Sequence, residues 1–162
     1  MHRLALSASL FALAAAPALA FGELPSALWP QPDAPVHVVG CSAFVTEMRN
    51  GANVREHASF EVAGTRTATA VRIGWAYFDV LGARHVSAAL TTGKFSPGVR
   101  IDMHQFRGRV GTETKSVTCF AMEAAFEDGT HWRALPREYP RSADATGDAP
   151  PSGAPAPVPS PT

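Results

Sequence analysis

Proline is distributed very unevenly along this chain. The sequence contains 14 prolines, yet only Pro97 lies between residues 36 and 135. Proline has no backbone N–H to donate to a β-ladder, so it is largely confined to turns, bulges and sheet edges. A stretch of about 100 residues that is almost free of proline can be continuous sheet, and it is long enough for one hydrophobic core. We therefore expect one folded domain, over residues 36–135.

The first 20 residues have the pattern of a secretory signal peptide. A basic start at His2 and Arg3 is followed by an apolar run over residues 4–16, and residues 18–20, Ala-Leu-Ala, fit a small-x-small cleavage site. The apolar run is too short for a membrane span, which needs about 20 apolar residues. We expect the protein to be exported, to the periplasm or beyond the cell, with no integral membrane segment in the mature chain.

Two proline-rich segments flank the expected domain. Residues 21–35 form an N-terminal arm, in which Leu24, Leu28 and Trp29 are predicted to line one side of a short helical turn that packs on the domain. Residues 136–162 are rich in proline and alanine and contain almost no large apolar side chains. Such a segment cannot offset the entropy of ordering, so a disordered tail is predicted.

Within the domain the pattern is that of short strands separated by turns. The expected strands span residues 36–48, 57–62, 67–80, 85–92, 99–106, 117–126 and 130–134. Val71, Ile73, Trp75 and Tyr77 share one face of the third strand, and Asp128-Gly129 is a typical hairpin turn. No helical periodicity follows the signal. The pattern predicts an all-β fold, a single antiparallel β-sandwich of immunoglobulin-like architecture with about seven strands; a small closed barrel is the alternative.

The two cysteines, Cys41 and Cys119, are predicted to form a disulfide, because an exported protein folds in an oxidising compartment. A reactive or metal-binding thiol is the alternative. Because side chains alternate between the two faces of a strand, Cys41 should lie on the face opposite Phe44, and Cys119 on the face opposite Phe120. If the phenylalanines point into the sandwich, both sulfur atoms point outward and the bridge lies on the outside of one sheet. An inward bridge beside Trp75 would match immunoglobulin domains, and a β-bulge would reverse the parity.

Charge and motifs exclude several classes of function. Removing residues 1–20 removes one basic residue, Arg3, and leaves 13 basic against 14 acidic residues. This balance argues against nucleic acid or anionic membrane as a partner. The sequence has no G-x-S-x-G element and no glycine-rich phosphate loop. We therefore predict a non-enzymatic protein, with no catalytic residues, no cofactor-binding residues and no cofactor.

The histidines are the candidate metal ligands. After the signal they are His37, His57, His85, His104 and His131, and none is spaced as in H-x-x-x-H. Spacing alone therefore predicts no metal site. Folding could still bring two or three of them onto one face, with Met48 or Met103 as a softer ligand, in a copper or zinc site.

Two local patterns resemble a known group of proteins. Residues 93–99 read G-K-F-S-P-G-V, and residues 126–132 read F-E-D-G-T-H-W after Cys119. Together they are similar to small exported bacterial β-sandwich proteins, immunoglobulin- or fibronectin-III-like, of unknown function. The resemblance implies that the second pattern closes the domain as its last hairpin, and it brings no catalytic residues. Glu127, Ala121 and Ala124 depart from the group's pattern.

Two functions are consistent with these observations. The first is an exported, non-enzymatic β-sandwich that binds a protein or cell-envelope partner through an edge strand or a loop rim. The alternative is a periplasmic protein that binds copper or zinc through some of its histidines and methionines. A small hydrolase is a third and more distant possibility, because no nucleophile motif supports it.

Overall fold

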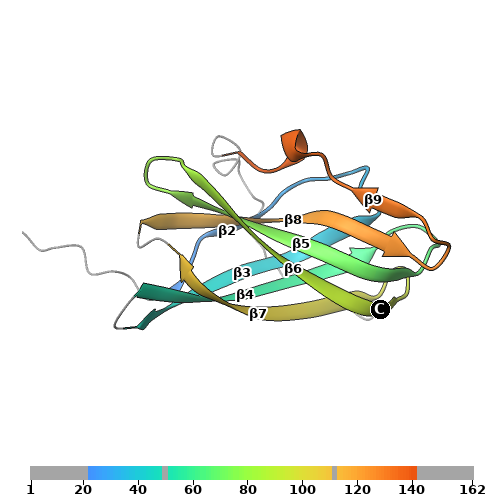
Figure 1. The fold of residues 1–162 in the computed structure, drawn as a ribbon, viewed down its shortest axis with the longest axis horizontal. Coiled ribbons are helices and arrows are strands. Elements are labelled where there is room, and N and C mark those ends of the chain that lie inside the picture. The colour runs from blue at the N-terminus through green and yellow to red at the C-terminus, as the bar shows by residue number, and fades with distance from the viewer. Residues whose placement is uncertain (1–21, 49–50, 111–112, 142–162) are drawn as a thin grey trace, which may run out of the picture.

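The computed structural model describes residues 22–48, 51–110 and 113–141, and at positions 47–48, 51–52 and 107–110 it describes the backbone alone. Two β-sheets pack face to face around one core (Figure 1). The predicted all-β sandwich is confirmed. The expected signal peptide and the part of the expected tail after residue 141 lie outside the described residues. Within those residues, no helix is long and apolar enough to cross a membrane.

Sheet A has the strand order β1-β3-β4-β7, with antiparallel pairing throughout. Its strands are β1 (Gly22–Glu23), β3 (Val36–Met48), β4 (Gly51–Val62) and β7 (Arg100–Val110). Strands β3 to β9 correspond to the seven predicted strands. The second of them begins at Gly51, earlier than the predicted residue 57, so the turn expected over residues 49–53 is shorter.

Sheet B has the order β2-β8-β5-β6, and β9 also pairs with β8. Its strands are β2 (Ser26–Leu28), β8 (Thr114–Phe126), β5 (Ala68–Asp79), β6 (Arg84–Phe95) and β9 (His131–Arg133). The predicted hairpin between β8 and β9 is confirmed: Gly129 has φ of 80°, which glycine adopts at little cost. Val71, Ile73, Trp75 and Tyr77 share one face of β5, as predicted, and that face is directed into the core.

The predicted disulfide forms, but its position differs from the parity expectation. Cys41 on β3 is bonded to Cys119 on β8, so the bridge joins the two sheets. Cys119 is fully buried in the main core, opposite Trp75. The expectation that both sulfurs point outward is wrong, because the phenylalanines do not point into the core: Phe44 is 46% exposed, and Phe120 belongs to a separate cluster on the other side of sheet B.

That separate cluster covers the outer face of sheet B. Phe120 and Phe78 pack there against Trp29 from the arm and Tyr139 from beyond β9. The rings of Phe120 and Tyr139 have centroids 4.8 Å apart. Strand β8 therefore carries buried apolar residues on both faces, and alternation alone could not show which face meets the other sheet.

A β-bulge in β8 adds to this ambiguity. Ile73 of β5 pairs with Ala121, whereas Arg72 pairs with Glu123, so Met122 is the extra residue. Such a bulge shifts the alternation by one residue. Cys119 and Ala121 face the main core before it, and Ala124 and Phe126 face the core after it. Uninterrupted alternation would place Phe120 and Phe126 on the same face, whereas the bulge puts them on opposite faces of sheet B.

The arm packs on the domain, as predicted, but as strand rather than helix. Residues 26–28 form β2, parallel to β8, and the Trp29 N–H donates to the Cys119 carbonyl at 2.9 Å. The Gln31 side chain both donates to and accepts from the Ala121 backbone, at 3.0 and 2.8 Å. A one-turn helix leaves most of its backbone groups unpaired, whereas the edge of β8 offers partners.

The folded part of the chain also extends beyond the predicted boundary at residue 135. Residues Pro136–Glu138 form a 3₁₀ turn, η1, and Tyr139 then packs against Phe120. The segment from residue 136 to 141 therefore belongs to the cover of sheet B.

Candidate functional site

The outer face of sheet A, called the open face below, differs from the covered face of sheet B. It is formed by side chains of β3, β4 and β7 that point away from sheet B. Its principal members are His37, Ser42, Phe44, Arg55, His57, Ser59, Glu61, Arg100, Asp102, His104 and Phe106. Because directly paired residues of antiparallel strands point to the same side, these residues form rows across the sheet.

The first row places an arginine between two exposed aromatic rings. Phe44 pairs with Arg55, and Arg55 pairs with Phe106. The guanidinium carbon of Arg55 lies 5.0 Å from the centroid of the Phe106 ring, within the range of a cation–π contact. Phe106 is 74% exposed and Phe44 is 46% exposed. Two phenylalanines are thus left in solvent on this face, whereas the other phenylalanines that the structure describes are buried.

The second row brings two of the candidate histidines together. His57 on β4 pairs directly with His104 on β7, and their rings stack with centroids 4.5 Å apart and planes inclined by 25°. The nitrogen lone pairs of stacked imidazoles lie in nearly parallel planes. The two rings in this arrangement do not converge on one metal ion.

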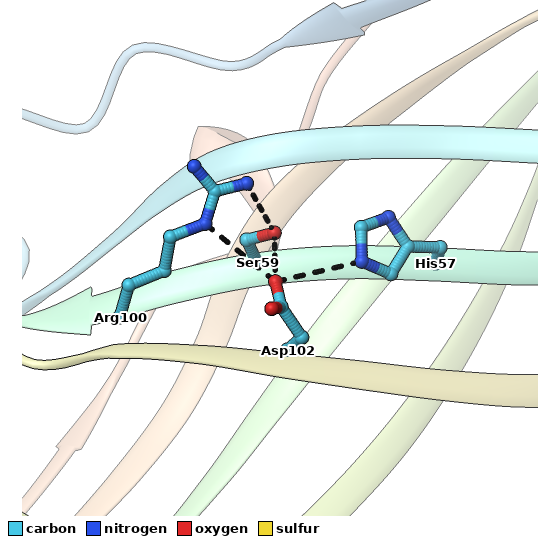
Figure 2. A network of polar contacts seen from close by, with 4 residues as sticks. All are labelled: His57, Ser59, Arg100 and Asp102. Atoms are coloured by element: carbon cyan, nitrogen blue, oxygen red, sulfur yellow. Dashed lines mark hydrogen bonds and ion pairs between the residues drawn. The ribbon is translucent and has the colours of Figure 1, made fainter.

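The third row forms a polar network around Asp102 (Figure 2). The Ser59 hydroxyl donates to Asp102 Oδ1 at 2.5 Å and accepts a hydrogen bond from Arg100 Nη2 at 2.8 Å. The same Oδ1 lies 3.5 Å from His57 Nε2 and 3.6 Å from Arg100 Nε. One carboxylate oxygen is therefore shared by three neighbouring side chains.

Gly40 gives this network its space. It pairs with Ser59 directly after an irregularity in β3 between Val38 and Gly40. A Cβ atom at position 40 would lie 2.8 Å from Ser59 Oγ and 3.2 Å from Arg100 Nη2. Any larger residue would push the hydroxyl or the guanidinium aside. Because of this fit, Ser59 is buried although it belongs to an outer face.

The network also sets the ionisation of Asp102. The Ser59 hydrogen bond is the largest cause that lowers the pKa of Asp102 below its ordinary value. Desolvation is the next largest effect and opposes it, whereas the positive charge of Arg100 and the proximity of His57 lower this pKa further. Asp102 is therefore a fixed carboxylate near neutral pH, with Oδ1 occupied by its neighbours.

The order of groups in this network is unsuited to nucleophilic catalysis. In a Ser-His-Asp triad the imidazole stands between the hydroxyl and the carboxylate and removes the hydroxyl proton. Here the carboxylate of Asp102 stands between Ser59 and His57. The Ser59 oxygen is buried and accepts a hydrogen bond from Arg100, which reduces its nucleophilicity. The arrangement holds the charged groups of Arg100 and Asp102 in fixed positions.

The five candidate histidines are divided between the two sheets. His37, His57 and His104 lie in sheet A, whereas His85 lies on β6 and His131 on β9 of sheet B. Of the other proposed ligands, Met103 is buried in the core and the side chain of Met48 lies outside the described residues. Across the described ranges, no three His, Cys, Asp or Glu side chains are grouped so that they could hold a metal ion.

Sequence reasoning missed most of the open face. Arg100, Asp102, His104 and Phe106 alternate along β7, and this alternation was a local signal for one polar, aromatic face. Their partners on β4 could not be found locally, because His57 and His104 meet only through the pairing of β4 with β7.

No family model, curated protein or solved structure matches this chain. The resemblance to small exported bacterial β-sandwich proteins therefore remains a prediction. The functional interpretation depends on the site geometry.

Proposed function

We propose that this protein is an exported, non-enzymatic module that binds a partner protein through the open face of sheet A. The observation that carries this proposal is the row Phe44–Arg55–Phe106, with two exposed rings on either side of an arginine. On sheet B, the arm and the segment around Tyr139 cover the outer aromatic residues. No described segment does the same for Phe106.

The chemistry of the row fits a protein interface. Aromatic residues and arginine are enriched in interfaces and dominate their binding energies. Full burial of a phenylalanine side chain contributes about 1.5–3 kcal/mol, so an exposed Phe106 represents favourable energy available to a partner. Arg55 is already held near the Phe106 ring, which reduces the entropy that it loses on binding.

The polar network next to the row supplies a preorganised rim. The open face carries arginines, Arg55 and Arg100, and carboxylates, Glu61 and Asp102, at comparable numbers. A mixed face of this kind suits a protein surface that offers both charges, whereas a polyanion requires a predominantly basic face. Neighbouring Arg100 and Asp102 are fixed through Ser59, so they can orient a partner without first being ordered.

Affinity capture with matched variants tests this function. The purified domain would be immobilised and exposed to the envelope and secreted fractions of the source cells. The variants are Arg55→Ala combined with Phe106→Ser, and a control, Leu81→Ser, at a turn residue that is 86% exposed. We expect one protein to be retained by wild type and the control and lost by the double variant. Equal retention by all three proteins would contradict the proposal.

A second candidate is binding of copper or zinc, and the two candidate histidines that lie in contact, His57 and His104, are the pair that would carry it. Because their stacked rings do not converge on one ion, this function requires one ring to rotate out of the stack. Intact mass after incubation with Cu²⁺ or Zn²⁺ and native desalting tests this candidate. Stoichiometric metal that is lost in His104→Ala but kept in His131→Ala would support it, and an unchanged mass would remove it.

A further inference from the structure

Strand β6 is an edge of sheet B with an unusual composition. Within the described chain it pairs with β5 alone, and its register with β5 is continuous from Arg84 to Thr92. Its other side therefore presents backbone N–H and C=O groups along a long, regular strand. Such an edge can accept a further strand unless charges, prolines or bulges prevent it.

The corresponding edge of sheet A is protected in this way, and β6 is not. The open-face positions of β7 include Arg100, Asp102 and His104, so that edge carries charges of both signs. In β6, residues 86–93 read V-S-A-A-L-T-T-G, with no charge and no proline. The bulge in β6 lies at the end of this run, between Thr92 and Phe95. The β7 edge therefore carries a protection against strand addition that residues 86–93 of β6 lack.

A groove lies beside this open edge. It has a volume of about 300 Å³ on the outer face of sheet B and runs from Leu90 on β6 to His131 and Arg133 on β9. Small residues, Ala70 and Ala125, lie between these walls. Leu90 is 53% exposed. In recognition by strand addition, backbone hydrogen bonds provide affinity and a neighbouring pocket provides selectivity for a side chain.

The charges at the two ends of β6 indicate what kind of strand it accepts. Arg84 lies at one end and Lys94 near the other, and β6 contains no acidic residue. Antiparallel pairing of two copies about Ala89 would place Arg84 directly opposite Lys94, and like charges in direct opposition destabilise a sheet. Lys94 is paired with Glu127 at 2.8 Å, whereas Arg84 hydrogen-bonds to the Pro140 carbonyl. The uncompensated charge is therefore at Arg84.

We propose that β6 accepts an extended segment of another protein as an additional strand of sheet B. The segment is apolar or Thr-rich at its centre, carries an acidic residue opposite Arg84, and presents a large apolar side chain next to Leu90, towards the groove. This surface is separate from the open face, so it adds a second recognition site to the module and does not depend on the function proposed above.

A designed peptide tests the proposal directly. The probe is a labelled peptide of about ten residues, matched in length to β6, with alternating valine and threonine, a central leucine and a glutamate at the end that meets Arg84. The control has the same sequence with N-methyl groups on the backbone amides of one edge. We expect fluorescence anisotropy to show binding of the probe, weakened about tenfold or more by N-methylation. Equal binding of both peptides would overturn strand addition.

Charge reversal and hydrogen exchange locate the binding site. Arg84→Glu should weaken binding of the glutamate peptide and restore binding of a lysine-ended version, whereas Lys115→Glu, with the same change in net charge, should leave both unchanged. Bound peptide should protect alternate amides of β6 from exchange. The proposal would be overturned if the peptide protected the amides of His57 and His104 in place of those of β6. It would also be overturned if the β6 amides were protected without any peptide and this protection disappeared when the protein was diluted. The second result would identify another copy of the chain as the added strand.

Discussion

Cys119 lies directly opposite Trp75 on neighbouring strands of sheet B, and its sulfur crosses the core to Cys41 in sheet A. Immunoglobulin domains also pack a tryptophan of their third strand against an inter-sheet disulfide, which joins their second and sixth strands. Here Trp75 is on the third of the seven main strands and Cys119 is on the sixth, but Cys41 is on the first. The bridge has the immunoglobulin position in sheet B and is displaced by one strand in sheet A.

The disulfide is expected to contribute strongly to stability. It closes a separation of 78 residues, for which the chain-entropy model gives about 4–5 kcal/mol. Replacing Cys41 and Cys119 together by alanine should lower the free energy of unfolding by an amount approaching this value. Urea unfolding of the variant and the oxidised wild type measures the difference. A loss below about 1 kcal/mol would mean that the bridge does not restrain the unfolded chain as inferred.

Gly74 is expected to be intolerant of a side chain. It pairs with Phe120, and a Cβ atom at position 74 would lie 2.6 Å from that ring and 2.8 Å from Met122 Sδ. Gly74→Ala should therefore cost about 1–3 kcal/mol of stability, as overpacking generally does. Gly93→Ala, whose Cβ would approach the Phe95 ring only to 3.2 Å, is the milder control. If thermal unfolding shows the same midpoint for both variants, the contact with Phe120 does not destabilise Gly74→Ala.

Glu56 should contribute to stability although its carboxyl group is buried. It is buried between the sheets and accepts hydrogen bonds from Tyr77 at 2.5 Å, from Ser87 at 3.2 Å and from Gln105. Glu56→Ala removes the acceptor of these three hydrogen bonds, and a buried donor left without a partner costs about 1–3 kcal/mol of stability. The substitution also leaves a cavity, which lowers the stability further. Glu56→Gln keeps the shape and should cost less. Denaturant titration that ranks the two variants in the opposite order would contradict this role.

The ionisation of Asp102 should depend on Ser59. The pKa of Asp102 is lower in the folded protein than its ordinary value near 3.9, mainly because of the Ser59 hydroxyl. The carboxylate therefore stabilises the fold at pH above the unfolded pKa, and this contribution is lost as pH falls through the folded pKa. Ser59→Ala should raise the pKa of Asp102.

Carboxyl ¹³C NMR titration measures this shift with an internal control. The pKa of Asp128 is also lowered, by hydrogen bonds from Thr130 in the β8–β9 turn. It should not change in Ser59→Ala. An unchanged pKa of Asp102, or an equal shift at Asp128, would contradict the proposed network.

The sequence predicted those features that depend on local pattern. The near absence of proline over residues 36–135 predicted a single β-domain. Asp128-Gly129 predicted the last hairpin, and the two cysteines predicted the disulfide. Simple alternation did not predict which face of β8 meets the other sheet. Phe120 is buried on the outer side by the arm and Tyr139, and a bulge at Met122 shifts the alternation. Neither effect has a local signal.

The candidate site was harder to predict, for a related reason. The scattered histidines were candidate ligands only for the alternative function, and their spacing predicted no metal site. Strand order places His85 and His131 in sheet B, and it brings His57 and His104 together as a stacked pair. The row Phe44–Arg55–Phe106 unites three strands that are distant in sequence. Large aromatic rings are usually expected to be buried, so the exposure of two phenylalanines on the open face was not predicted.

Site-specific photocrosslinking from the open face tests the central claim most directly. A benzophenone amino acid would replace Phe106 in the protein produced by its own cells, with the same replacement at Leu81, which is even more exposed, as the control. The proposal predicts a discrete adduct with one protein at position 106, absent at position 81 and abolished by Arg55→Ala. No adduct at position 106, or the same adducts at both positions, would contradict a binding function for this face.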